Sequence, residues 1–275
     1  MNMFTHNMFT NDFAVQTEAA LQRASLGRKL LQAYAIPMGT IPRLSRERDV
    51  KSFVWPGGNR MSDMFSQIEE FIIPTHEIAT EFEREIPAGA TDWRLQSIFG
   101  QIQIDIITNV EEKEGAAVLR TISESVPFDH VISAEILSPE SLLQAMAILD
   151  DHGFPAANII VSPRRLEHVV SEMEGFCGTV GGGRMLGADI HASSFVRDDV
   201  VFVLAPPENV GVIPIRQSMT IISNSDGSYN YFGGVAYEEI GIAVINDIAT
   251  AKIVIGEDIV EKEVVKEEIL GDFEW

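Results

Sequence analysis

One long helical segment constrains the fold of this 275-residue chain more than any other feature. A Thr-Asp pair can cap a helix that begins at Trp93 and reads WRLQSIFGQIQIDIITNVEEKEGAAVLRTISES. It would run for about 35 residues, against a mean of about 12, although Gly115 is a candidate break. Trp93, Ile104 and Ile107 lie off its main apolar stripe. We therefore expect this helix to be covered on more than one side.

Strands and helices alternate after residue 129. Ser138 can cap one helix and Ser162 the next, and each serine is followed by a proline at the first helical position. Strand-like runs return after the second helix and continue to the closing stretch YEEIGIAVINDIATAKIVIGED. Strands thus gather toward both ends of the chain with helices between them, which predicts the α+β class.

The residues before the long helix predict an arm and a ribbon. The first dozen read as a flexible end, and residues 13–34 have helical spacing. Strand-like runs then flank a Pro-Gly-Gly-Asn turn at residues 56–59, and another strand follows at 71–73. A hairpin of this length has no evident partner in its own chain. Such a ribbon either aggregates or is covered by something else.

Charge is distributed unevenly. The net charge of −21 argues against a nucleic-acid reader, which needs a basic surface. Residues 1–50 carry six basic and four acidic residues, a balance of +2, so the remainder carries −23. A basic arm on an acidic body can dock on a neighbouring copy or pack on its own domain. No apolar run approaches the ~20 residues of a membrane span, so we expect no membrane segment.

Candidate chemistry is sparse. The glycine-rich loop at 178–187, GTVGGGRMLG, lacks a Lys-Ser/Thr ending and leads into a strand, which favours a mobile surface loop over a phosphate cradle. Asp189 and His191 can share a strand face, but no further metal ligand lies nearby. Cys177 is the single cysteine and has no adjacent basic residue to activate it. We expect no enzyme activity, no cofactor and no metal.

The order of these parts resembles the tailed-bacteriophage major capsid proteins of the Hong Kong 97 fold, an encapsulin-like superfamily. The resemblance covers about residues 40–256. RDVKSFVWPGGNRMSDMFSQIEEFIIPTHEIATEFEREI is similar to that family's extended loop and returning strand, and the long helix to its spine helix. LSPESLLQAMAILDDHGFPAANIIVSPRRLEHVVSE resembles its axial domain. NVGVIPIRQSMTIIS and EEIGIAVINDIATAKIVI resemble its closing strands.

The resemblance implies a Hong Kong 97-type capsid fold with an N-terminal arm, an extended β-hairpin loop, a spine helix, and peripheral and axial domains. The implied parts are an arm at 1–45, an extended loop at 46–76, a peripheral domain with the spine helix at 77–128, an axial domain at 129–236, and closing peripheral strands with an acidic tail at 237–275.

It also implies a function. The chain would be a major capsid protein whose hexamers and pentamers form an icosahedral head around double-stranded DNA, without sequence-specific binding. Portal, scaffolding and decoration proteins would be partners, and virions would assemble in the host cytoplasm. Encapsulin shells share the fold, so an encapsulin-like bacterial or archaeal compartment shell is the alternative. An unrelated acidic enzyme is the third possibility.

Two groups of residues are candidates for subunit contacts. The basic arm is expected to dock on acidic neighbours, and the ribbon to reach over an adjacent subunit. Lys51 could in addition join an asparagine in an isopeptide cross-link, although a lone lysine is more often a solvated charge. The glycine-rich loop is expected to lie at the capsomer axis, with Glu172 and Glu174 the nearest acids to its arginine. The interface candidates are Arg43, Arg46, Arg48, Lys51, Trp55, Gly57 and Gly58, and the axis-loop candidates are Gly181, Gly182, Gly183 and Arg184.

Overall fold

The computed structural model describes residues 3–37, 40–47, 68–87, 91–172, 184–223 and 231–256. The helices are α1 (Met3–Ala24), α2 (Gly27–Leu30), α3 (Asp92–Ser125), α4 (Pro139–Asp151), α5 (Pro163–Glu172) and α6 (Pro207–Val210). The strands are β1 (Gln32–Ala35), β2 (Arg43–Glu47), β3 (Ile68–Ile72), β4 (Thr75–Glu85), β5 (Val131–Ala134), β6 (Asn158–Val161), β7 (Arg184–Met185), β8 (Ala188–Ala192), β9 (Val200–Leu204), β10 (Gly211–Ser223), β11 (Tyr231–Gly241), β12 (Ala243–Val244) and β13 (Thr250–Ile255).

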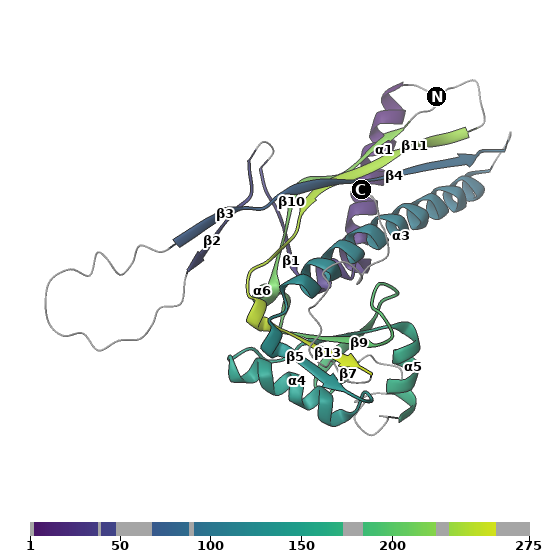
Figure 1. The fold of residues 1–275 in the computed structure, drawn as a ribbon. Helices are drawn as coiled ribbons and strands as arrows, with labels where there is room; N and C mark the ends of the chain where they lie inside the picture. The colour runs from purple at the N-terminus through teal and green to yellow at the C-terminus, as the bar shows by residue number, and fades with distance from the viewer. Residues whose placement is uncertain are drawn as a thin grey trace, which may run out of the picture.

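A five-stranded sheet forms the elongated part of the molecule. Its order is β1-β10-β11-β4, with β12 pairing to β10. β1 lies parallel to β10, and the long strand β11 lies between β10 and β4 and is antiparallel to both. Helices α1 and α3 run beside this sheet (Figure 1), and the core between them includes Leu21, Ile78, Phe82, Ile106 and Phe232.

A six-stranded sheet forms the second part, in the order β5-β13-β9-β6-β8-β7. One face packs against α4 and α5, through a core that includes Leu142, Leu149 and Val203. The other face contributes Phe202 and Leu204 to the core that contains α3. Because both faces are covered, β6 and β9 are buried along their whole length, as expected for strands inside a layered α/β arrangement.

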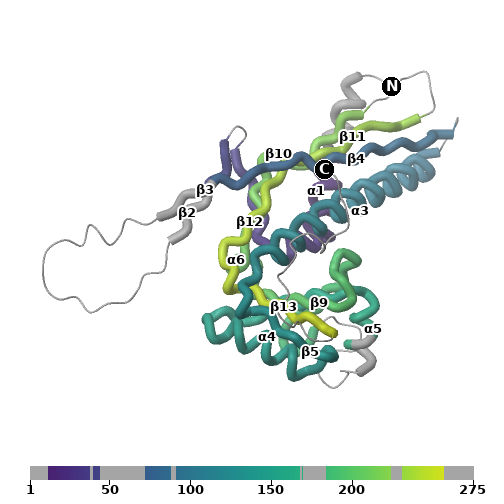
Figure 2. The backbone as a smooth tube through the Cα atoms, viewed as in Figure 1, coloured from purple at the N-terminus to yellow at the C-terminus, as the bar shows by residue number. Residues whose placement is uncertain are grey.

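The chain crosses between the two sheets near its C-terminal end. β10 and β11 lie in the five-stranded sheet with β4. β13 lies in the six-stranded sheet, between β5 and β9. Figure 2 shows the chain passing from β11 through β12 to β13. Ala251, Ile253 and Ile255 share one side of β13 and are buried in the core with Leu142 and Leu149, whereas Lys252 lies on the other side.

Helix α3 is as long as the sequence predicts, at 34 residues. Gly115 does not break it. Buried residues continue on both sides of this glycine, with Val110 before it and Val118 and Leu119 after it. The packing of that stripe outweighs the cost of about 1 kcal/mol for one glycine in a helix interior.

The N-terminal region differs from the sequence-based prediction. The backbone is helical from Met3, where a flexible end was expected, and the helix ends at Ala24 rather than continuing to residue 34. Gly27 explains the stop, because a side-chain carbon built there would lie 2.9 Å from Glu114 Oε1 and 3.0 Å from Val118 Cγ2. The chain makes the short helix α2 at this close contact and then pairs as β1 with β10.

The serine caps are confirmed. Ser138 accepts a hydrogen bond from the backbone N–H of Ser141, and the Ser141 side chain accepts one in return from the N–H of Ser138. Ser162 accepts a hydrogen bond from the N–H of Arg165 at the start of α5. Gly153, which ends the α4 region, has a φ of 80°, a conformation that glycine adopts without strain.

Candidate assembly surfaces

The base of the predicted ribbon is an antiparallel pair of strands. β2 pairs with β3 from Arg43 opposite Ile72 to Glu47 opposite Ile68. Figure 1 shows this pair projecting away from both sheets. The Arg43 side chain is exposed, and Arg46 lies on β2 opposite Glu69. The candidates Arg48, Lys51, Trp55, Gly57 and Gly58 lie outside the described residues.

One face of β4 is strongly acidic. Alternate residues of a strand point to the same side, and on β4 these positions include Glu77, Glu81, Glu83 and Glu85, all exposed. The opposite side of the strand carries Ile78, Thr80 and Phe82, which are buried in the core. We call these four glutamates the β4 acidic face. Like charges at this spacing repel one another, so the face favours a cationic partner.

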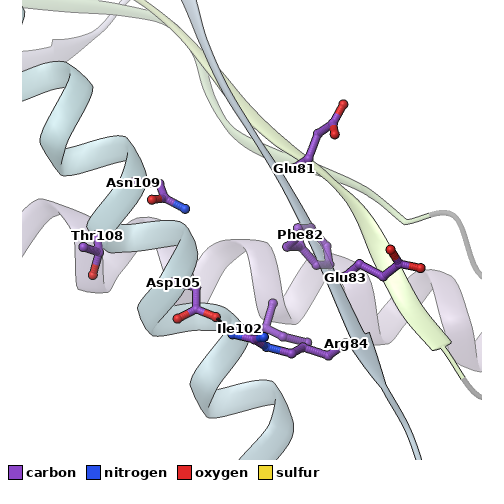
Figure 3. A pocket seen from close by; sticks show the side chains of 8 residues that line it. All are labelled: Glu81, Phe82, Glu83, Arg84, Ile102, Asp105, Thr108 and Asn109. Atoms are coloured by element: carbon purple, nitrogen blue, oxygen red, sulfur yellow. Dashed lines mark hydrogen bonds and ion pairs between the residues drawn. The ribbon is translucent and has the colours of Figure 1, made fainter.

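A groove of about 340 Å³ lies between β4 and α3 (Figure 3). The carboxylates of Glu81 and Glu83 point away from the helix, whereas Arg84 reaches across to form an ion pair with Asp105. The side-chain amide of Gln101 donates a hydrogen bond to Asp105; this bond, together with Arg84, lowers the pKa of the carboxyl. None of the eight lining residues is a histidine, cysteine or serine.

The first half of α3 exposes large apolar side chains. Trp93 is 71% exposed and Ile104 is 58% exposed, although the sequence predicted a helix covered on several sides. Beyond this region Ile106, Val110 and Val118 are buried in the core. A single subunit therefore covers only part of the helix.

The predicted axis loop is described only at its end. Gly181, Gly182 and Gly183 lie outside the described residues. Arg184 is the first residue of β7, which pairs with β8. Its Nε donates to Asp189 Oδ1 at 2.6 Å. Glu174 and the side chain of Glu172, the acids that the sequence placed nearest to it, lie outside the described part of the chain. The carboxylate of Asp189 raises the pKa of Arg184 further.

The structure does not unite Asp189 and His191 in a metal site. Asp189 pairs with Arg184, while His191 Nε2 lies 3.0 Å from Asn158 Oδ1. Burial, with Lys29, lowers the pKa of His191. Among the described residues no group of three or more His, Cys, Asp or Glu side chains is placed to hold a metal ion. None of the described helices is long and apolar enough to cross a membrane.

A buried ion cluster joins the N-terminal region to the rest of the subunit. Arg28 on α2 is 2% exposed and contacts carboxylates from three other elements. Its Nη1 donates to Glu18 on α1 at 2.8 Å, its Nε to Glu114 on α3 at 3.1 Å, and its Nη2 to Glu238 on β11 at 2.6 Å. Ser25 donates a further hydrogen bond to Glu114. We call Glu18, Arg28, Glu114 and Glu238 the Arg28 cluster.

This cluster decides, at one position, between the two interpretations of the basic arm. Arg28 is one of the six basic residues in 1–50, which could dock on a neighbouring copy or pack on their own domain, and it packs on its own subunit. Burial opposes its charge, and the three carboxylates more than compensate and raise its pKa. Glu114 and Glu238 lie 86 and 210 residues away in sequence, so no local pattern could have revealed the cluster.

Comparisons with known proteins agree on the architecture. No family model and no curated protein sequence matches the chain. Among solved structures, a virus-like particle from Pyrococcus furiosus matches with a TM-score of 0.54 and 15% identity, covering 89% of this chain and 99% of that one. The capsid of an empty GTA particle matches with a TM-score of 0.61 and 12% identity, covering 85% and 90%. The chain has the Hong Kong 97 fold.

The Hong Kong 97 fold is found in both capsids and encapsulins, and both classes are represented among the matches. The SrpI encapsulin of Synechococcus elongatus matches with a TM-score of 0.55 and 11% identity, covering 85% of this chain and 88% of that one. By their place in the chain, α3 is the predicted spine helix, a name kept below, and β2 and β3 lie at the base of the predicted extended loop.

Proposed function

We propose that this chain is a structural subunit that assembles into a closed protein shell. The observation that carries the proposal is the Hong Kong 97 fold over most of the chain, together with a ribbon that projects away from the body. A projecting two-stranded ribbon has little independent stability and becomes useful once another copy covers it. The exposed Trp93 and Ile104 of the spine helix would be covered in the same way.

We infer that the β4 acidic face receives the first segment of the ribbon, residues 43–51, of a neighbouring copy. That segment carries four basic residues, Arg43, Arg46, Arg48 and Lys51, against two acidic ones, and the face presents four exposed carboxylates. Opposite charges on two surfaces steer them together and fix their register. A contact between different surfaces of identical subunits closes into rings, which is the geometry that hexamers and pentamers require.

The proposed shell is an icosahedral head built of hexamers and pentamers that encloses double-stranded DNA. The net charge of −21 supports this content, because an acidic wall does not adhere to a polyanion. Portal, scaffolding and decoration proteins would complete the particle, and the assembled protein would belong to a virion formed in the host cytoplasm. An encapsulin-like compartment is the second candidate, favoured by the match to the SrpI encapsulin.

Negative-stain microscopy and light scattering of the purified chain test this proposal. We expect closed particles, or rings of five and six subunits that close when the ionic strength is changed. Particles from expressing cells, treated with nuclease before disruption, distinguish the two candidates: protected DNA supports a capsid, and a co-purified enzyme inside the shell supports a compartment. A strictly monomeric protein across low and moderate salt would reject shell formation altogether.

A further inference from the structure

The Arg28 cluster brings three carboxylates onto one guanidinium in the interior of the subunit. Glu114 and Glu238 are fully buried, and Glu18 is 14% exposed. Glu18 also accepts a hydrogen bond from the backbone N–H of Met219 on β10 at 2.9 Å, which suits its ionised form. If all three carboxyls were ionised, the cluster would hold two negative charges in excess. Buried charge of that kind is costly, and the group takes up a proton instead.

The geometry identifies the carboxyl that holds the proton. Glu238 Oε2 accepts from Arg28, while Oε1 is buried and has no hydrogen-bond partner in the part of the chain that the structure describes. An ionised Oε1 would be an unsolvated charge, whereas a protonated one is a neutral hydroxyl. Burial raises the pKa of Glu238 to about 8; Arg28 opposes this rise, and Glu114 and Glu18 add to it.

We propose that a single proton on Glu238 latches the N-terminal helices α1 and α2 onto the spine helix α3 and the five-stranded sheet. The cluster takes one carboxylate from α1, its cation from α2, one carboxylate from α3 and one from β11. Undocking α1 and α2 removes Arg28 from Glu238 and admits water, so Glu238 then ionises and releases its proton. The latch operates inside one subunit and is independent of the proposed shell function.

The direction of the pH effect follows from the two states of Glu238. Its pKa is about 8 when docked and near its ordinary value of 4.5 when undocked. Docking is therefore fully favoured below about pH 4.5 and is weakened progressively as the pH rises to about 8. Over that interval the undocked-to-docked ratio increases about tenfold per pH unit, because one proton is released. Burial also raises the pKa of Glu111 on α3, although the nearby charge of Lys29 opposes this rise. Glu111 therefore adds a smaller pH dependence of docking with the same sign.

Hydrogen exchange measured by mass spectrometry on the full chain tests the latch. The protection of α1 amides, corrected for the intrinsic pH dependence of exchange, should fall about a hundredfold between about pH 5.5 and 7.5 in the wild type. Peptides from α4, in the other sheet layer, serve as the internal reference and should change far less. Glu238→Gln is neutral at every pH and should abolish most of the fall. Glu239→Gln, on the adjacent residue of the same strand, should behave as the wild type.

Three outcomes would overturn the latch. The first is α1 protection that does not change with pH in the wild type. The second is a fall in α1 protection in Glu238→Gln as large as in the wild type. The third is a fall that is lost in Glu239→Gln to the same extent as in Glu238→Gln. If Glu238→Gln does not fold, Glu114→Gln replaces it. Removing the Glu114 charge lowers the pKa of Glu238, so α1 protection should reach its high-pH plateau at a lower pH. An unshifted plateau in that variant would also reject the proposal.

Discussion

Ser25 donates a 2.5 Å hydrogen bond to Glu114, which ties the end of α1 to the middle of the spine helix. The same carboxylate accepts from Arg28 Nε, and Gly27 lies close above it without a side chain. The turn between α1 and α2 is thus built around one buried glutamate. This contact determines where the N-terminal helix ends and which way the chain leaves it.

Arg28→Met is the most destabilising single change we expect outside the apolar core. It retains the length of the side chain but leaves Glu18, Glu114 and Glu238 without their common partner. Removing one member of a buried ion pair typically costs about 3–5 kcal/mol, because the remaining charge is uncompensated. Chemical denaturation at neutral pH should show a loss of this size.

Arg120→Met is the matched control for that experiment. Arg120 forms an exposed ion pair with Glu124 one helical turn away on α3. Such surface pairs contribute about 0–1 kcal/mol. A loss in Arg28→Met no larger than in Arg120→Met would show that the Arg28 cluster does not support the fold.

A charge exchange tests the contact between ribbon and acidic face. Reversing Arg43, Arg46 and Arg48 together to glutamate should block assembly while leaving a folded subunit. All three are changed at once because one exposed ion pair alone contributes only about 0–1 kcal/mol. Changing Glu77, Glu81 and Glu83 to lysine should block it equally. Combining the two sets restores opposite charges and should restore particles in light scattering and microscopy. Normal particles from either single set, or no recovery in the combination, would contradict this contact.

The sequence predicted those elements whose signals are local. Helix α4 was located from its serine cap and proline, and the spine helix from its Thr-Asp cap and its apolar stripe, although Gly115 was a candidate break and does not break it. The end of α1 was mispredicted, because residues 25–28 contact Glu114, which lies far away in sequence and is invisible to a local pattern. The neighbours of β13 are likewise distant in sequence, because β5 and β9 enclose it in the sheet.

Ser138→Ala should weaken the start of α4. The variant removes a side-chain acceptor for the Ser141 N–H and breaks the reciprocal capping box. Loss of such a cap typically costs about 1 kcal/mol. Thermal or chemical denaturation should detect the change, with Ser133→Ala on β5, an exposed strand position, as the control. Equal stability of the two variants would mean that the cap makes no net contribution.

Gly234→Ala should disrupt the pairing of β10 and β11. A side-chain carbon at residue 234 would lie 2.2 Å from the carbonyl oxygen of Ile222, so the backbones must separate. Gly233→Ala is the matched control. A side-chain carbon at residue 233 would lie 3.1 Å from the carbonyl oxygen of Phe82, so the backbone needs a smaller adjustment there. We expect a clear loss of thermal stability in Gly234→Ala and a smaller one in Gly233→Ala. The reverse order would contradict the strand register.

Arg184→Ala should fold normally and alter assembly. The side chains of Arg184 and Asp189 are both exposed, so the loss of this ion pair should change the stability of the subunit little in chemical denaturation. At a symmetry axis the same arginine would be repeated five or six times, and Asp189 would offset part of the mutual repulsion. The variant leaves Asp189 unpaired in every copy, which should change the salt dependence of capsomer stability. Asp189→Asn, which instead leaves the arginines unpaired, should shift it in the opposite direction. We also expect no saturable nucleotide binding to the wild type or to Arg184→Ala. Identical salt profiles for both variants and the wild type would place this residue away from any symmetry axis.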